Sequence, residues 1–298
     1  THNWVPAVAG TNGDKRPAIP SRLPNTPLSH SRIVAGAVLA QGRRPFATDS
    51  VMTSLTPLAF IAAIFLLAGF VKGVIGMGLP TVAVGLLGLT MPPSQAAAVL
   101  ILPSLVTNVW QAFAGGHFRD VARRLWPMLV GICIGTWFGA MAVPDAKGGE
   151  ATIWLGVALV IYAGFGLCNI HLHTPRRHEG WIGAIVGIAT GVISFATAVF
   201  AIPGVPYTQS LGFDRDRLVQ ALGLSFTVST IALATALSHS GEMNAGVALP
   251  TAAALVASLL GMLVGQKIGG LASPKTFRLC FFIGLLALGA HLALHGLL

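Results

Sequence analysis

Residues 69–116, GFVKGVIGMGLPTVAVGLLGLTMPPSQAAAVLILPSLVTNVWQAFAGG, and residues 187–237, GIATGVISFATAVFAIPGVPYTQSLGFDRDRLVQALGLSFTVSTIALATAL, share one pattern that decides the fold. In each stretch an apolar helix runs into small or helix-breaking residues, followed by a short apolar arm, a turn and a full-length apolar helix. In a membrane protein, broken helices at corresponding positions of two halves indicate a transport site near the bilayer midplane. The repetition therefore predicts two related halves around a central site.

The composition predicts an integral membrane protein. Apolar residues make up 54% of the chain and charged residues 9%, and the mean hydropathy is +0.77, so a conventional water-facing surface cannot form. Eight apolar stretches are long enough to span roughly 30 Å of hydrocarbon, which takes about 20 helical residues each. They are Leu55–Val71, Ala96–Ala114, Leu125–Val143, Ile153–Ile170, Ile182–Phe200, Leu218–Leu237, Val247–Val264 and Phe277–Leu298.

Two further apolar arms, Leu79–Met91 and Ala201–Leu211, are too short to cross comfortably at about 1.5 Å per residue. Glycine and proline punctuate both arms, and proline frees carbonyl groups that only protein or trapped water can satisfy inside a bilayer. We therefore predict an all-α polytopic membrane protein of two inverted-topology repeats, with about 5+5 crossings of which two are short or broken arms.

Basic residues orient these crossings. Ten lie in loops that this topology places in the cytoplasm, against Lys147 alone in a loop on the other side, as the positive-inside rule requires. The ten are Arg119, Arg123, Arg124, Arg176, Arg177, Arg215, Arg217, Lys267, Lys275 and Arg278. The net charge of +9 thus indicates membrane topology, and because the basic residues are spread over four loops without interleaved aromatics, no nucleic-acid partner is expected.

The pattern divides the chain into four parts. Residues 1–51 are rich in Pro, Ser, Asn and Arg and are expected to be a disordered or non-native extension, because Met52 stands directly before the first hydrophobic helix. If this basic tail is natural and cytoplasmic, the first pair of crossings is miscounted. The first membrane repeat is expected at 52–170, a cytoplasmic connecting loop at 171–180, and the second repeat at 181–298.

The polar residues argue against catalysis and metal binding. Every acidic residue after Met52 falls in a predicted loop, so no carboxylate is available for an intramembrane aspartyl dyad, and no nucleophile stands with a base. The three cysteines have no metal-binding spacing, and His171, His173 and His178 fit a solvated interfacial loop better than a metal site. We expect no enzyme, no metal and no cofactor, with proton or ion coupling left open.

Neutral polar groups and one lysine are the candidate ligands. Asn108 and Gln111 share a helical face with Ser104, and helix-to-helix hydrogen bonding and substrate contact are equally good explanations for Asn108 and Gln111. Helix-to-helix hydrogen bonding is the favoured explanation for the other polar residues of these helices, which are Ser104, Thr107, Ser225, Thr227, Ser229 and Thr230. Lys72 borders the first break; it either snorkels to the cytoplasmic interface or lends positive potential to an anion path. A site without acidic groups, near the amino ends of half-helices, favours an anion.

These residues carry a resemblance to a known family. The stretch FVKGVIGMGLPTVAVGLLG, the later PGVPYTQSLGFDRDRLVQALGLSFTVSTIALA and their repetition resemble the TauE/SafE family of sulfite-exporter-type permeases, or TSUP transporters, over Met52 to Leu298. The family's glycine-rich signature matches Gly73, Gly76, Gly78 and Pro80, and its proline-bearing signature matches Pro203, Pro206 and Gly212. GMGLP replaces the usual run of glycines, and Ser194 to Thr197 stand where glycines are usual in the second repeat.

The resemblance implies a multi-pass transporter of the bacterial inner membrane that moves small sulfur-containing or organic anions, such as sulfite or sulfonates. The resemblance and the two broken helices together predict alternating access around a midplane anion site. The spacing of small residues allows a homodimer. An anion channel or a carrier of another small organic solute is the alternative. The expected substrate-binding residues are Lys72, Gly76, Gly78, Pro80, Asn108, Gln111, Pro203, Tyr207 and Gln209.

Overall fold

The computed structural model describes residues 55–142, 149–168, 172–239, 248–269 and 274–296. The chain divides into two units, Thr1–Phe46 and Ala47–Leu298, and every described residue belongs to the second. The predicted extension at 1–51, Lys147 and His171 therefore lie outside the described residues.

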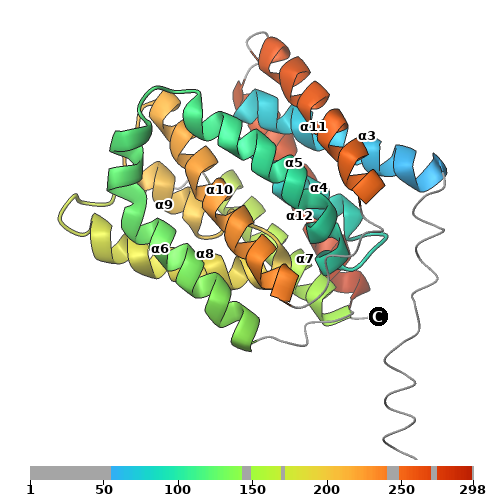
Figure 1. Ribbon diagram of the computed structural model, residues 1–298, viewed down its shortest axis with the longest axis horizontal. Coiled ribbons are helices and arrows are strands. Elements are labelled where there is room, and N and C mark those ends of the chain that lie inside the picture. Colours follow the sequence, from blue (N-terminus) through green and yellow to red (C-terminus); the bar gives the residue numbers. More distant parts are fainter. Residues whose placement is uncertain (1–54, 143–148, 169–171, 240–247, 270–273, 297–298) are drawn as a thin grey trace, which may run out of the picture. The chain divides into compact units, whose positions relative to one another are not determined.

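The described residues form helices and no strand, which confirms the all-α fold (Figure 1). The helices are α3 (Leu55–Ile75), α4 (Leu79–Leu87), α5 (Pro93–Phe113), α6 (Phe118–Ala142), α7 (Gly149–Leu167), α8 (Glu179–Thr197), α9 (Gly204–Ser210), α10 (Arg215–His239), α11 (Ala248–Ile268) and α12 (Pro274–His295). Eight of them are long and apolar enough to cross a membrane. Together with large apolar side chains exposed on the bundle surface, such as Trp110, Trp137 and Trp181, they make this a multi-pass membrane protein.

The two remaining helices, α4 and α9, are the predicted short arms. At 1.5 Å per residue they measure about 14 Å and about 10 Å, less than half of the roughly 30 Å hydrocarbon core. Each follows a long helix that ends at a break, α3 before α4 and α8 before α9. The repeated pattern of the sequence thus has a direct structural counterpart.

The most extensive helix packing joins helices of one half to helices of the other half. Counting from the breaks, α3 to α7 correspond to α8 to α12, and the contacts obey that correspondence: α3 packs extensively on α11, and its equivalent α8 packs on α6. Helices α5 and α10 pack on each other, as do α7 and α12. The end of α3 and the start of α10 border one cavity, and Arg124 of α6 bonds both Glu179 at the start of α8 and the Leu211 carbonyl just before α10. Helix α3 therefore ends, and its equivalent α8 begins, at the same end of the bundle, so the second half is inverted.

Glycine allows α6 to approach α8 closely and α3 to approach α11 closely. On α6 and α8, a Cβ built at Gly135 or Gly191 would collide with the backbone of the other helix. On α3 and α11, Gly69 and Gly261 stand in the same relation. Small residues let membrane helices approach until their backbones touch, which is what both pairs do. The spacing at Gly131, Gly135 and Gly139 is therefore used within the chain, against α8.

Helices α5 and α10 form the centre of the bundle. In each of them 67% of the most apolar 18-residue window is buried, against 28–44% in the other six spanning helices. In Figure 1 they run beside each other through the middle of the drawing, with α6 and α8 on one side and α3 and α11 on the other. Polar residues on α5 and α10 are consequently enclosed by protein on most sides.

Candidate anion site

The site begins at the break that ends α3. The backbone adopts positive φ at Gly76 (83°) and Gly78 (103°), a region that side chains with a Cβ rarely occupy. Pro80 then stands in the first turn of α4, where its missing N–H costs nothing. The local sequence alone thus accounts for a helix that ends, turns and restarts within a few residues.

Lys72, in the last turn of α3, points into the bundle. Its side chain is only 3% exposed, and its Nζ donates to Thr107 Oγ1 at 3.2 Å and to Asn108 Oδ1. A snorkelling lysine would leave its amine in water, so that explanation for Lys72 is wrong. Among the described residues no carboxylate pairs with it, and its two acceptors are neutral.

A directed chain of hydrogen bonds continues from Lys72 toward the middle of the bundle. Asn108 Nδ2 donates to Ser104 Oγ at 2.9 Å, and Ser104 Oγ lies 3.2 Å from Thr230 Oγ1. Since the Thr230 hydroxyl donates to the Phe226 carbonyl at 2.7 Å, Ser104 is the donor of the pair. Ser104 lies near the midpoint of α5 and Thr230 near that of α10, so the chain joins one helix of each half.

Gln111 lies at the outer end of this polar path, next to the end of α3. Its Nε2 donates to the Gly76 carbonyl at 2.6 Å and to the Val219 carbonyl at 2.8 Å, so one amide ties the end of α3, α5 and α10 together. Because both N–H groups are used, the orientation of the amide is fixed. Its Oε1 is buried and has no hydrogen-bond partner among the described residues.

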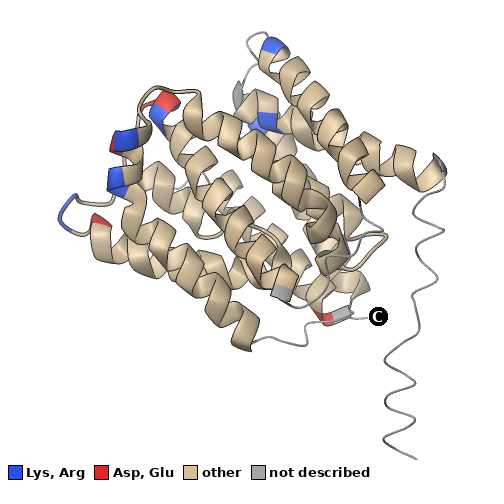
Figure 2. Ribbon diagram, viewed as in Figure 1, with Lys and Arg blue, Asp and Glu red and all other residues tan. Residues whose placement is uncertain are grey.

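A cavity of about 510 Å³ adjoins these groups. Lys72, Gly76 and Gln111 line it together with Val219 and Gln220 of α10, Gln266 of α11, and the exposed Arg215 and Asp216 at its rim. Arg124, Arg176 and Arg217 surround a neighbouring depression at the starts of α6, α8 and α10. Figure 2 shows the charged residues gathered around these helix ends, so the cavity opens on the basic face, which the positive-inside rule assigns to the cytoplasm.

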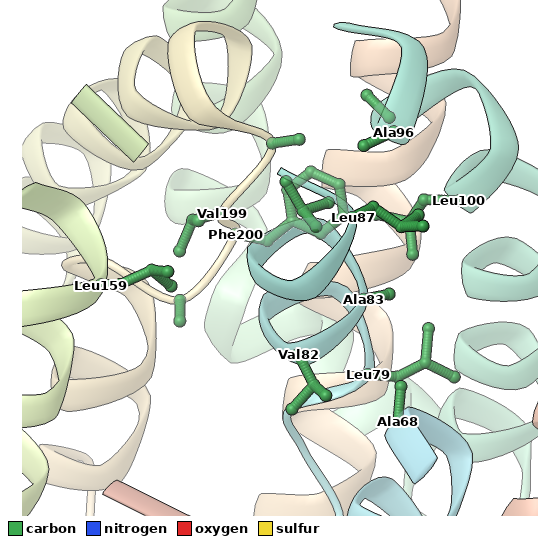
Figure 3. Close-up of a cluster of buried hydrophobic side chains, with 14 of the residues drawn as sticks. Ala68, Leu79, Val82, Ala83, Leu87, Ala96, Leu100, Leu159, Val199 and Phe200 are labelled. Atoms are coloured by element: carbon green, nitrogen blue, oxygen red, sulfur yellow. The ribbon is translucent and has the colours of Figure 1, made fainter. Parts of the chain in front are cut away.

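Apolar side chains fill the bundle beyond this path. Leu87 of α4, Leu100 of α5 and Leu159 of α7 pack with Val199 and Phe200 from the second break in one buried cluster (Figure 3). All five are at most 2% exposed. The first break therefore borders the cavity, whereas the second break is enclosed in apolar packing.

The cavity brings together only part of the predicted site. Lys72, Gly76 and Gln111 line it, and Asn108 is bonded to Lys72. Gly78 lies against the ring of Phe281, and Pro80 is buried in α4. The residues predicted from the second repeat lie elsewhere: Pro203 precedes α9, Gln209 is exposed, and the Tyr207 hydroxyl donates to the Glu179 carbonyl at 2.6 Å.

The depth of the first break also differs from expectation. The hydrogen bond between Gln111 and Gly76 places the break within about one turn of the end of α5, nearer the basic face than the helix midpoints. The polar groups that reach the middle are Ser104 and Thr230, for which helix-to-helix hydrogen bonding was the favoured explanation.

One ion pair was missed by the sequence analysis. Arg124 donates to both carboxylate oxygens of Glu179, at 2.8 and 2.5 Å, and to the Leu211 carbonyl at 2.8 Å, and its guanidinium lies 4.7 Å from the centre of the Phe213 ring. The predicted loop positions of Asp120, Glu150, Glu179 and Asp216 are wrong, because each of them lies in the first turn of a helix. Of these four, Glu179 is buried. The only available signal was a lone acidic residue among basic ones.

Comparison with known proteins gives a consistent result. The model of a family described as sulfite exporter TauE/SafE matches residues 61–292. A curated protein of Cupriavidus necator, "Probable sulfite/organosulfonate exporter TauE", is 26% identical over 251 residues, which cover 80% of this chain and 95% of that protein. No solved structure matches. The family match covers all ten described helices in whole or in part, including both breaks and the cavity. This chain is a member of the sulfite exporter TauE/SafE family.

Proposed function

We propose that this chain is a secondary transporter that moves small sulfur-containing or organic anions, such as sulfite or sulfonates, across the bacterial inner membrane by alternating access. One observation carries the proposal: the amine of Lys72 is buried beside a cavity and has only neutral partners among the described residues. Ionisable groups buried inside membrane proteins are costly, and they mark substrate or ion pathways.

The cost of burying Lys72 explains why an anion is the favoured ligand. A buried charge without a partner loses its hydration, and neutral hydrogen bonds replace only part of that loss. Asn108 and Thr107 supply such neutral bonds. An anion in the adjacent cavity would complete the compensation, so its binding is favoured by a charge that is already in place. Gly76 lines the cavity and has no side chain, which lets the ligand approach the main chain closely.

The family and the relative's name support the substrate class. The relative in Cupriavidus necator is described as a probable sulfite and organosulfonate exporter. Sulfite and short sulfonates are small anions, and a cavity of about 510 Å³ has room for one with part of its hydration shell. We propose a transport role for the buried charge of Lys72 and no catalytic activity.

The two ends of the polar path have different surroundings, and this difference supports alternating access. The cavity is open at the basic face, and the apolar cluster around Leu87 and Phe200 fills the opposite side, as expected for a carrier facing the cytoplasm. We propose that the repeats at 52–170 and 181–298, joined by the loop at 171–180, rock against each other through their exchanged helix pairs. The second break would then open to the other side as the first closes.

Flux measurements in liposomes test this function. The wild-type protein should take up sulfite or a short sulfonate with a rate that saturates with concentration, whereas a channel would conduct without saturation. A hydrogen bond to a charged group contributes about 1.5–3 kcal/mol, so Lys72→Gln should lower the transport rate at limiting substrate about tenfold or more. Lys267→Gln is the matched control, because Lys267 is exposed at the same end of the neighbouring α11 and does not line the cavity. Equal rates for a folded Lys72→Gln protein and the wild type would refute the site.

A further inference from the structure

Helices α5 and α10 are joined by a reciprocal pair of glutamines. Gln111 of α5 donates to the Val219 carbonyl of α10 at 2.8 Å. In return, Gln220 of α10 donates to the Ala112 carbonyl of α5 at 2.7 Å. Gln111 is 7% exposed and Gln220 is 1% exposed, so water competes little for either bond. We call Gln111, Ala112, Val219 and Gln220 the glutamine clasp.

The two backbones touch beside the glutamine clasp, and Gln220 also fixes the turn that follows α5. A Cβ at Gly223 of α10 would lie 2.7 Å from the Ala112 nitrogen. The Gln220 Oε1 accepts from the backbone N–H of His117, the residue before α6, at 3.1 Å. The Ala112 carbonyl is among the last four of α5, which have no partner within the helix. One side chain of α10 therefore holds both the end of α5 and the start of α6.

The glutamine clasp lies where two equivalent groups of helices meet. Helix α11 packs on α3 and α5, and its counterpart α6 packs on α8 and α10. Helices α5 and α10 then pack on each other and join the two groups. Each group combines helices of both repeats. A rocking motion of one group against the other therefore acts on the contact between α5 and α10.

The glutamine clasp is intact while the cavity is open. Gln111, Val219 and Gln220 line the cavity, so its opening at the basic face does not require their hydrogen bonds to break. Toward the opposite face, α5 and α10 place apolar residues such as Leu100 and Leu233 in the buried cluster. Apolar contacts are non-directional, whereas a buried polar group that loses its partner is costly. The contact therefore separates more readily at its apolar end than at the glutamine clasp.

We propose that the glutamine clasp is the pivot of the transport cycle, and that Gln220 is a positioning residue that keeps the two groups of helices aligned as they rock. The inference rests on the proposed alternating access and locates its hinge. Without the clasp, α5 and α10 can also separate at the basic face. Fewer of their motions then lead from one open state to the other, so the maximal transport rate falls.

A disulfide bridge can replace the glutamine clasp reversibly. A Cβ built at Gly115 would lie 3.5 Å from the Cβ of Gln220, within the range of about 3.5–4.5 Å that a disulfide needs. In protein whose three native cysteines are replaced by serine, Gly115→Cys with Gln220→Cys lacks the clasp when reduced and regains a link when oxidised. The assay is sulfoacetate uptake by liposomes, because sulfite would cleave the disulfide. Gln220→Cys alone, treated with the same oxidant and reductant, is the matched control.

The reduced double variant should have a maximal rate at least about fivefold below that of its cysteine-free parent, which corresponds to about 1 kcal/mol, a typical net contribution of one hydrogen bond. Its KM should stay within about twofold, because the Gln220 amide bonds to backbone and not to the anion. Oxidation should restore most of the lost rate, and the single variant should not respond. Gln220→Met, which keeps the length of the side chain and loses its hydrogen bonds, should show the same fall in rate and the same KM.

The remaining outcomes contradict the inference in different ways. Loss of transport on oxidation would mean that α5 and α10 must part at the glutamine clasp, so it is not a pivot. Equal rates in the reduced and oxidised states would overturn a positioning role for Gln220, and a raised KM at an unchanged maximal rate would assign it to anion binding. In each case transport by the cysteine-free parent still stands. Absence of saturable uptake by the unmodified protein for every anion refutes the proposed function itself.

Discussion

The closeness of α6 and α8 leads to a quantitative prediction for Gly135→Ala. A Cβ at this position would lie 2.7 Å from the carbonyl carbon and 2.8 Å from the Cα of Ile188 on α8. These are backbone atoms, which cannot rotate away as a side chain can, so the two helices must separate. Overpacking of this kind costs about 1–3 kcal/mol. Alanine also favours the helix over glycine by about 1 kcal/mol, which offsets part of that cost.

A substitution at a second glycine separates the gain in helix propensity from the cost of overpacking. Gly284 lies inside α12, and a Cβ there would meet nothing within 4 Å, so Gly284→Ala should show the helix-propensity gain alone. The two variants should therefore differ by the overpacking cost, about 1–3 kcal/mol, with Gly135→Ala the less stable. The assay is unfolding of the purified protein in detergent micelles by increasing SDS, followed by tryptophan fluorescence. Equal unfolding midpoints would refute the close backbone contact, and Gly261→Ala on the equivalent α3–α11 pair should behave as Gly135→Ala does.

Two further predictions concern the basic face and the direction of opening. Arg124→Ala should destabilise the protein by about 1–3 kcal/mol in the same unfolding assay, since it removes a half-buried ion pair with Glu179 and a bond to backbone, whereas the exposed Arg123→Ala should have little effect. In protein whose three cysteines are replaced by serine, Val219→Cys should react with a membrane-impermeant thiol reagent applied at the basic face, and Ala96→Cys, buried in the apolar cluster, should not. Comparable labelling of both cysteines, or equal stability of the two arginine variants, would contradict these assignments.

The helices and breaks could be predicted because their causes are local. Long apolar runs must form helices in lipid, where backbone groups have no water to bond, and Gly76, Gly78 and Pro80 cannot continue a regular helix. All eight spanning helices and both arms were predicted this way, with ends that differ by up to seven residues, the largest difference being at the start of α6. Lys72 was also identified locally, as the charged residue that borders a break, and Gln111 as a polar residue on the first long helix of the repeat.

The location of the site required the tertiary structure. Sequence symmetry predicts that both breaks line one cavity, yet the first borders the cavity while Phe200 and Val199 of the second are enclosed in apolar packing. Which break borders the cavity depends on the packing of α3 on α11 and of α6 on α8. These contacts join residues that are distant in the sequence, and hydropathy does not encode them. The same pairing places Glu179 against Arg124 and Tyr207 against α8, at the basic face.

The sequence by itself determined a membrane protein of inverted halves with two broken helices, because composition and backbone chemistry act residue by residue. Only the tertiary structure decided that the Lys72 amine turns inward. A lysine one turn from a helix end can reach water or protein equally well. Thr107 and Asn108 decide between the two, because the fold places these residues of α5 within reach of the amine.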